Sequence, residues 1–224
     1  MQNNKTYIMV QDETNLNPTP FVVILGDRNM KKTIIYTIIA FAAFTTSVFA
    51  QTWTVDPDHT SADFSIQHMA ISHVTGSFNQ VTGQLVFDKD GRHPESVDIT
   101  IDVASIDTGV DKRDEHLKSP DFFDVKTYPT ITYTSKNIIP QGEGRYKVVG
   151  TLNMHGVSKT VTLAVEGLVS NEKDPWGNTR KGAHVTAELN RKDFGIVYNA
   201  VLESGNLMIG ETVDIVINLE FLKK

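Results

Sequence analysis

The sequence predicts an all-β domain in which eight antiparallel strands close into a β-barrel, accompanied by one or two short helices. Eight segments alternate apolar and polar side chains with a period of two residues, which is typical of strands that bury one face. Glycine-containing turns separate several of these segments at hairpin spacing. Helical periodicity is scarce, so these observations favour a fold built from β-hairpins.

The alternation is clearest in the middle and at the end of the chain. In segment 96–103, Val97, Ile99 and Ile101 share one face, while polar residues occupy the other. Segment 212–221 repeats this pattern from Val213 to Phe221. Weaker runs complete the set. The predicted strands are 62–68, 83–87, 96–103, 131–133, 146–152, 160–165, 183–190 and 212–221.

Turn and helix signals lie between these strands. Segments 88–91 and 141–144 contain hairpin-type turns, 155–156 is a short His-Gly connection, and 174–178 is a longer loop. Residues 111–118 predict a short helix, because acidic residues come early, Lys118 comes late and Pro120 ends it. Segment 69–74 is expected to form a single helical turn.

Closure into a barrel would remove the exposed edges of an eight-stranded antiparallel sheet. A two-sheet sandwich leaves the same alternation and remains an alternative. A barrel of this size is wide enough to be filled by side chains or to hold one slender ligand. The pattern therefore leaves open whether the interior is solid or hollow.

The N-terminal region carries the three parts of a secretory signal peptide in residues 30–50. Met30-Lys31-Lys32 is a basic head, 33–46 is an uncharged apolar stretch, and Val48-Phe49-Ala50 is a small-residue exit. The apolar stretch is short for a bilayer span, which needs about 20 residues. We expect cleavage after Ala50, with 1–29 a spurious or disordered extension and 51–224 the mature domain.

The charge of the expected mature chain disfavours nucleic acid as a partner. Residues 51–224 carry 17 basic and 24 acidic side chains, a net charge of −7. An acidic surface repels phosphate backbones and anionic membranes. The chain has no cysteine, so packing and strand pairing must supply its stability.

A set of short motifs runs in order along the whole of residues 51–224. They are Asp58-His59-Thr60-Ser61, Phe64-Ser65-Ile66-Gln67-His68, Gly76-Ser77-Phe78, Ser105-Ile106-Asp107-Thr108, the run 113–124, Tyr128-Pro129, 132–135, Gly150-Thr151-Leu152, His155-Gly156-Val157-Ser158-Lys159, Val161-Thr162-Leu163, Asp174-Pro175-Trp176-Gly177, Arg180, Gly182 and the run 191–196. These motifs resemble the YceI-like family. The resemblance implies an extended, lipocalin-like eight-stranded barrel, usually periplasmic, that holds a polyisoprenoid or another long apolar molecule. Ser158 and Thr160 depart from the family pattern at positions where Thr and Pro are common.

The sequence gives little support for a catalytic site or a metal site. His59, His68 and His73 lack metal-ligand spacing, and no Gly-x-Ser-x-Gly elbow is present, so we expect no enzyme activity, no cofactor and no metal. The run 113–116 looks catalytic, but charges on a short helix usually form a solvated face. By the resemblance, Leu117, Phe122 and Phe123 would anchor this helix across the barrel. Trp176 is expected to cap a barrel end or to contact a ligand.

The inward strand positions are the expected ligand-binding residues. An isoprenoid is long, thin and apolar, and suits a barrel lined by such side chains. His68 could instead be a hydrogen-bonded core residue, or it could meet the polar head of a lipid. The hypotheses are a carrier or reservoir for such a lipid, a solid-cored interaction or stress-response module and, with least support, an enzyme acting on such a lipid; a homodimer is a further expectation. The expected lipid-contacting residues are Phe64, Ile66, His68, Leu85, Phe87, Ile99, Ile101, Tyr133, Val148, Leu163, Val185 and Ile215.

Overall fold

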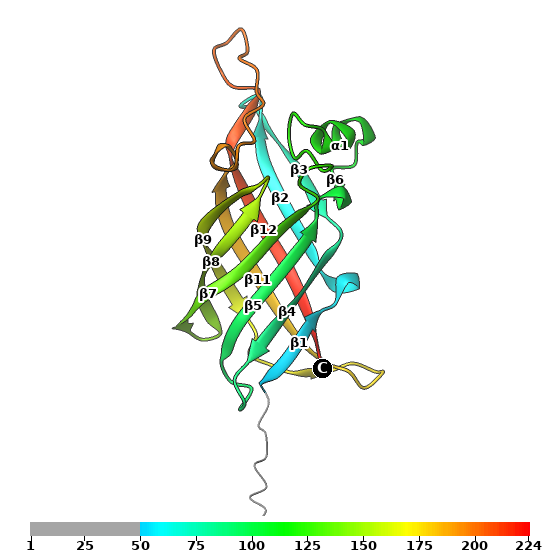
Figure 1. Ribbon diagram of the computed structural model, residues 1–224, viewed down its shortest axis with the longest axis vertical. Coiled ribbons are helices and arrows are strands. Elements are labelled where there is room, and N and C mark those ends of the chain that lie inside the picture. The colour runs from blue at the N-terminus through cyan, green and yellow to red at the C-terminus, as the bar shows by residue number, and fades with distance from the viewer. Residues whose placement is uncertain (1–49) are drawn as a thin grey trace, which may run out of the picture. The chain divides into compact units, whose positions relative to one another are not determined.

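The computed structural model describes residues 50–224, so the predicted extension and nearly all of the predicted signal peptide lie outside the described residues. The described part is an elongated barrel with one α-helix at one end (Figure 1). No helix of residues 50–224 is long and apolar enough to cross a bilayer. The strands are β1 (Gln51–Val55), β2 (Ser61–His68), β3 (Ser72–Phe78), β4 (Val81–Phe87), β5 (Pro94–Asp102), β6 (Ile106–Asp107), β7 (Thr130–Gly142), β8 (Arg145–Met154), β9 (Val157–Gly167), β10 (Glu172–Lys173), β11 (Thr179–Asn190) and β12 (Ile209–Lys223), and the helix is α1 (Asp111–Lys118).

The sheet closes on itself through eight antiparallel strands, which confirms the predicted fold. The closed order is β11-β9-β8-β7-β5-β4-β1-β12, and the β11–β12 pairing completes the ring. That pairing runs from Arg180↔Leu222 to Asn190↔Thr212 and is the longest in the ring. Each of these eight strands is therefore paired with a neighbour on both sides.

All eight predicted segments fall in strands, except that Val103 at the end of 96–103 begins a short 3-10 helix, and the structure adds strands that the sequence pattern did not indicate. One of them, β1, is part of the closed ring, where it pairs with both β4 and β12. It is only five residues long, too short to show a convincing alternation. By contrast, the predicted strand β2 pairs with β12 and β3 and is not one of the eight strands of the closed ring.

The expectation of a helical turn at 69–74 is wrong. Met69 and Ala70 have positive φ angles of 53° and 62°, which place them in the left-handed region of a tight turn. Ser72 then begins β3, which pairs with β2 from His68↔Ser72 to Ala62↔Phe78. The cross-strand ladder satisfies the backbone groups that a local helical turn would have used.

Helix α1 and the residues after it pack over one end of the barrel (Figure 1). Phe122 is buried, and Leu117 and Phe123 pack against the same core, as the sequence resemblance implied. Phe123 meets Phe78 of β3 edge to face, with 5.7 Å between the ring centroids. These apolar contacts hold the segment in place, because α1 has no side-chain hydrogen bond at its N-cap.

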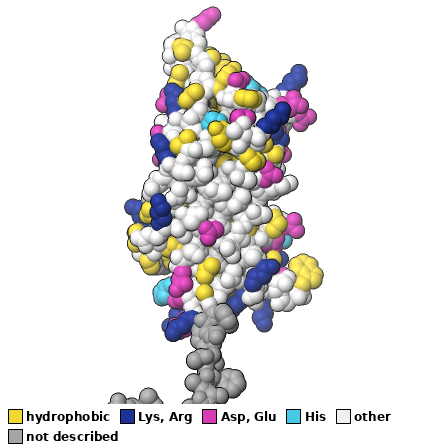
Figure 2. Space-filling view, in the orientation of Figure 1, with side chains coloured by type: hydrophobic (Ala, Val, Ile, Leu, Met, Phe, Trp, Pro, Cys, Tyr) yellow, Lys and Arg dark blue, Asp and Glu magenta, His cyan; other side chains and the backbone are white. Residues whose placement is uncertain are grey.

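The outer wall of the barrel is polar, as the alternation requires. Figure 2 shows charged side chains of both signs near the two ends of the visible face, with mostly uncharged surface between them. The opposite positions along each strand point inward and form one continuous apolar core. The fold therefore directs its aliphatic side chains to the barrel axis, where the candidate site lies.

Candidate binding cavity

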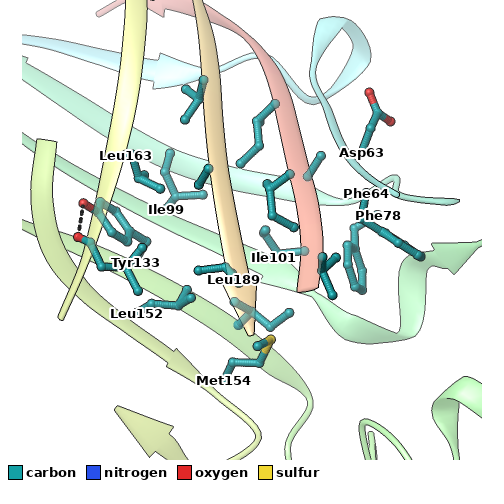
Figure 3. Close-up of a pocket in the computed structure, with 18 of the residues that line it drawn as sticks. Asp63, Phe64, Phe78, Ile99, Ile101, Tyr133, Leu152, Met154, Leu163 and Leu189 are labelled. Carbon is teal, nitrogen blue, oxygen red and sulfur yellow. Dashed lines mark hydrogen bonds between the residues drawn. The ribbon is translucent and has the colours of Figure 1, made fainter. Parts of the chain in front are cut away.

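The barrel interior is hollow. It contains a cavity of about 410 Å³ that runs from α1 at one end to Leu168 and Phe221 at the other. Most of its lining is aliphatic or aromatic, and the side chains come from nearly every strand of the barrel (Figure 3). A volume of this size is within the usual range for small-molecule sites, about 300–1,000 Å³. The cavity argues against the solid-cored alternative.

Eleven of the twelve expected lipid-contacting residues line this cavity, and one does not. Phe87 is fully buried but lies beyond the cavity, against Trp53. His68 lines the cavity and is half-buried, with no side-chain hydrogen bond to any residue between 50 and 224. The residues that line it are Phe64, Ile66, His68, Leu85, Ile99, Ile101, Tyr133, Val148, Leu163, Val185 and Ile215.

Tyr133 brings a buried polar group into the lining. Its hydroxyl donates to the carbonyl oxygen of Val148 at 3.0 Å and lies 3.4 Å from that of Val161 (Figure 3). Burial raises the pKa of this phenol to about 12. The ring rests on Gly150, where an added Cβ would come within 2.5 Å of the ring carbon Cζ. The phenol is thus satisfied by the barrel wall and presents its ring to the cavity.

One end of the cavity, here called the plugged end, is closed by Trp53, Phe87, Lys181 and Phe221. Their exposed fractions are 1%, 0%, 4% and 1%, respectively. The ammonium group of Lys181 lies over the rings of Trp53 and Phe87, 5.2 and 4.8 Å from their centroids, and donates to the carbonyl of Leu168 at 3.1 Å. Burial first, and then Lys223, lowers the pKa of Lys181.

The sequence reasoning missed this plug. Trp176, expected to cap a barrel end or to contact a ligand, is 81% exposed and does not line the cavity, whereas Trp53 is buried. The missed signal was the pair Trp53 and Val55, a short alternation directly after the predicted cleavage point. Lys181 gave no signal, since lysines are almost never buried and sequence alone does not show the rings above it.

An ion-pair network surrounds Arg180 beside the plugged end. Its guanidinium donates to the carboxylates of Asp56, Asp174 and Glu220 at 2.5, 2.9 and 2.9 Å. Burial works to raise the pKa of Asp174, but hydrogen bonds from Asn178, Arg180 and the backbone outweigh it and hold that pKa at about 2.

The same network explains a cluster with metal-like geometry. Donor atoms of Asp56, His59 and Glu220 lie within 4.8 Å of one another. His59 Nδ1 is 2.9 Å from Asp56 Oδ2, and the Arg180 guanidinium already supplies a cation to both carboxylates. The arrangement is therefore that of an ion-pair network holding β1, β11 and β12 together.

The opposite end, here called the helix end, is lined by side chains of α1 and its neighbours. Arg113 and His116 line the cavity, so the expectation that the charges of 113–116 form a solvated face is wrong for the half-buried Arg113, whereas His116 both lines the cavity and stays exposed to solvent. The His116 ring packs edge to face on Phe122 and Tyr198, with centroid distances of 4.9 and 5.0 Å. Packing of α1 across the barrel turns this face inward. Glu115 is exposed, as expected.

The lining combines a large apolar surface with a few polar and titratable side chains. Within residues 50–224 the lining contains no serine, threonine or lysine, and its hydroxyl groups are the phenols of Tyr133, Tyr146 and Tyr198. His116 Nε2 lies 3.0 Å from the carboxylate of Asp121, an exposed pair that orients the ring. What the cavity supplies is apolar surface with a few polar groups at the helix end.

Solved structures of similar fold come from several bacteria. BcnA of Burkholderia cenocepacia is 26% identical, with a TM-score of 0.64 over 74% of this chain and 98% of its own. A YceI protein of Campylobacter jejuni is 29% identical, with a TM-score of 0.59 over 70% and 90%. A protein of Saccharophagus degradans described as a polyisoprenoid-binding domain implicated in plant cell wall breakdown is 20% identical, with a TM-score of 0.57 over 77% and 98%, and shows likeness of fold alone.

Sequence comparison also finds YceI-like relatives in bacteria. A UPF0312 protein of Vibrio vulnificus is 34% identical over 170 residues, which cover 75% of this chain and 89% of the relative. A UPF0312 protein of Photorhabdus laumondii is 36% identical over 168 residues, covering 74% and 86%. The family profile described as the YceI-like domain matches residues 53–221, which include nearly the whole barrel. The chain therefore belongs to the YceI-like domain family.

Proposed function

We propose that this protein is an exported carrier or reservoir that holds a polyisoprenoid, or a similar long-chain apolar lipid, inside the barrel. The observation that carries the proposal is the cavity of about 410 Å³ with an almost wholly apolar lining. Hydrocarbon that moves from water into such a site gains about 25 cal/mol per Å² of apolar surface buried. A long, thin tail satisfies this lining without a charged partner along its length.

The shape of the barrel also favours a thin ligand. Inward side chains such as Ile101, Leu163 and Ile215 line the cavity between the plug and α1. Tyr133 is the main polar group within this apolar lining, and its hydroxyl donates a hydrogen bond to the Val148 carbonyl of the barrel wall. Membership of the YceI-like family and the polyisoprenoid-binding description of the Saccharophagus degradans protein are consistent with this ligand class.

Export follows from the segment 30–50. We propose that signal peptidase cleaves after Ala50, leaving residues 51–224 as the mature periplasmic or secreted domain. The first strand, β1, begins at Gln51, directly after this position. Intact-mass measurement of protein from the periplasm should give a chain that starts at Gln51, and a mature species starting at Met1 or Met30 would contradict it.

Ligand binding is tested by removing lipid and adding it back. Delipidated protein should bind a long-chain isoprenoid, and its melting temperature should rise with ligand concentration, because the ligand binds the folded barrel alone. Mass spectrometry of an organic extract of the purified protein should identify the natural ligand. The proposal fails if isoprenoids neither bind nor change the melting temperature.

A pair of β9 variants separates the cavity from the outer wall. Leu163 lines the cavity, whereas Thr160 on the same strand is exposed. Leu163→Asp should abolish lipid binding and lower stability, because a carboxylate would face hydrocarbon. Thr160→Asp should change neither property beyond a few tenths of a kcal/mol. Phe64→Ala widens the cavity while keeping it apolar, so this variant should retain binding.

A non-enzymatic role is part of the proposal. The lining between residues 50 and 224 has His68 and His116 but no serine, threonine or lysine, and the ring packed on His116 is that of Tyr198. If the bound isoprenoid is recovered unchanged after long incubation, the carrier role is supported. Conversion of the ligand by protein free of contaminants would favour the enzyme alternative instead.

A further inference from the structure

Strands β9 and β11 pair over only part of their length. Their ladder runs from Ala183↔Gly167 to Thr186↔Ala164, although the two strands contain 11 and 12 residues. Each strand pairs far more fully with its other neighbour, β9 with β8 and β11 with β12. Residues 157–163 of β9 and 187–190 of β11, here called the seam, therefore belong to no common ladder in the described barrel.

The seam lies between the cavity and the solvent. Leu163 and Leu189 point into the cavity from its two sides (Figure 3), and Val161 and Ala187 also belong to the lining. On the outer face of β9, Thr162 is exposed. Backbone hydrogen bonds between neighbouring strands normally close the wall of a barrel. At the seam, a stretch of this wall lacks the bonds that would hold two long strands together.

The two strands are fixed to each other on the side of the seam that faces the plugged end. Gly167 has a φ angle of 114°, and a Cβ added to it would lie 2.5 Å from the carbonyl oxygen of Gly182. Only glycine permits so close an approach of the two backbones. The four paired residues that begin at Gly167 continue this contact as a regular ladder. The strands can therefore part only toward the helix end.

On the side that faces the helix end, two polar contacts bridge the seam. Lys159 Nζ lies 3.0 Å from the Asp193 carboxylate, with side chains 41% and 56% exposed. His155 Nδ1 donates to the carbonyl of Phe194 at 3.0 Å. Asp193 and Phe194 belong to the short 3-10 helix η3 (Arg191–Phe194), which directly follows β11. Exposed ion pairs contribute little to stability, so these contacts break more easily than a strand ladder.

We propose that the seam is a lateral gate through which a long apolar ligand passes between the cavity and the surroundings, with the Lys159–Asp193 pair as its latch. This inference rests on the proposed function, because the gate would admit the lipid held in the barrel. Parting β9 from β11 leaves the β8–β9 and β11–β12 ladders intact, so the opening is local and requires no unfolding. A long ligand then leaves sideways, instead of being drawn out along its whole length past α1.

A covalent bridge across the seam tests whether it must open. Continuing the register of Ala164↔Thr186 by two residues places Thr162 opposite Glu188, and both side chains are exposed. The chain has no cysteine, so Thr162→Cys with Glu188→Cys introduces the only two thiols. If the thiols are too far apart for a direct disulfide, a bifunctional methanethiosulfonate reagent joins them, and the same reductant removes it.

Ligand exchange is followed with all-trans-retinol, a fluorescent isoprenoid alcohol. Protein loaded with retinol is mixed with an excess of phosphatidylcholine vesicles, and the loss of energy transfer from the protein tryptophans gives the release rate. We expect the bridged form to release retinol about tenfold or more slowly than the reduced form of the same variant, because the gating motion is blocked.

A bridge on the other side of β11 is the matched control. Glu188 pairs with Asp214 of β12 within a continuous ladder. Glu188→Cys with Asp214→Cys therefore keeps one of the two positions and moves the bridge to strands that are already held together. Oxidation of this variant should leave the retinol release rate unchanged.

Two acid-to-amide variants test the latch. Asp193→Asn removes the pair with Lys159 and should speed retinol release by about two- to fivefold, the range expected from loss of an exposed ion pair. Glu211→Gln removes the pair with Lys192, which joins η3 to β12 through side chains that are 38% and 39% exposed. That pair does not cross the seam, so its loss should leave the release rate unchanged.

The outcomes separate the gate from the proposed function. If neither retinol nor another isoprenoid binds, the proposed function fails and the gate fails with it. If retinol binds but the bridged and reduced seam variants release it at the same rate, the barrel holds lipid and the gate is overturned. Equal slowing by the control bridge also overturns the gate, since the effect would come from general stiffening. Equal rates for Asp193→Asn and Glu211→Gln overturn the latch.

Discussion

The two ends of the barrel differ in how they are closed. At the plugged end, Trp53 and Phe87 are 1% and 0% exposed, and the Arg180 network ties neighbouring strands together. At the helix end, the side chain of His116 is 43% exposed although it lines the cavity. One end is built like a protein core, and the other keeps part of the lining within reach of solvent.

This difference places the contacts that stabilise the fold at one end of the barrel and the opening for a ligand at the other. Well-packed aromatic side chains lose much free energy when they are truncated, because the surrounding structure relaxes only partly. A half-exposed helix with few buried contacts opens locally at lower cost. The contacts that contribute most to folding stability therefore lie at the plugged end. A ligand in the cavity would enter or leave at the helix end.

The largest effect should come from truncation of the plug. Phe87→Ala should lower the free energy of unfolding by about 3–5 kcal/mol, because the ring is fully buried. Leu117→Ala, on α1, should cost only about 1 kcal/mol, because that side chain is half-buried. Urea denaturation of the two variants measures the difference. Equal losses would remove the distinction between the two ends.

The Arg180 network should make the plugged end sensitive to acid. The folded pKa of Asp174 is about 2, below its ordinary value of 3.8, so its stabilising contribution is present above about pH 4 and is lost as the pH falls toward 2. Arg180→Gln should raise the folded pKa of Asp174 toward 3.8, so the variant should lose less stability between pH 4 and pH 2 than the unmodified protein.

Stability measured by urea denaturation between pH 2 and 7 tests the acid response. The control is Arg145→Gln, which breaks an exposed pair with Glu143 and should leave the profile unchanged. An Arg180→Gln profile parallel to that of the unmodified protein would show that the network does not set the acid response.

Tyr133, in the middle of the barrel, should give a smaller effect in alkali. Because burial raises its folded pKa to about 12 from 10, stability should fall as the pH rises from about 10 to 12. Tyr133→Phe should remove that component and cost about 1 kcal/mol at neutral pH through the lost hydrogen bonds. An unchanged alkaline profile in this variant would assign the effect to another group.

The smallest effect is expected at the helix end. His116→Ala should weaken lipid binding by about 0.5–1 kcal/mol, because the ring supports Phe122 and Tyr198 beside the cavity. Glu115→Ala, on the solvent side of α1, should leave binding unchanged. Isothermal titration with one isoprenoid compares the pair. A larger loss for Glu115→Ala would mean that the wrong face of α1 had been assigned to the cavity.

The local alternation of side chains was sufficient to predict which residues of most wall strands point into the barrel. The alternation at Val97, Ile99 and Ile101 fixes which face of β5 points inward, because successive side chains of a strand must point to opposite sides. The same rule placed Leu163, Val185 and Ile215 on the cavity lining. Phe87 follows the rule too, but its position along the barrel axis puts it in the plug.

The sequence by itself thus determined eight of the strands, their inward faces, the hairpin turns and the short helix, because these depend on neighbours a few residues apart. Closure through β1, the plug around Lys181 and the inward placement of Arg113 were decided by tertiary structure. Each depends on residues distant in sequence, such as Lys181 with Trp53 and Phe87. The hollow interior was also decided by tertiary structure, because the volume of a cavity depends on how inward side chains from opposite strands fill the space between them.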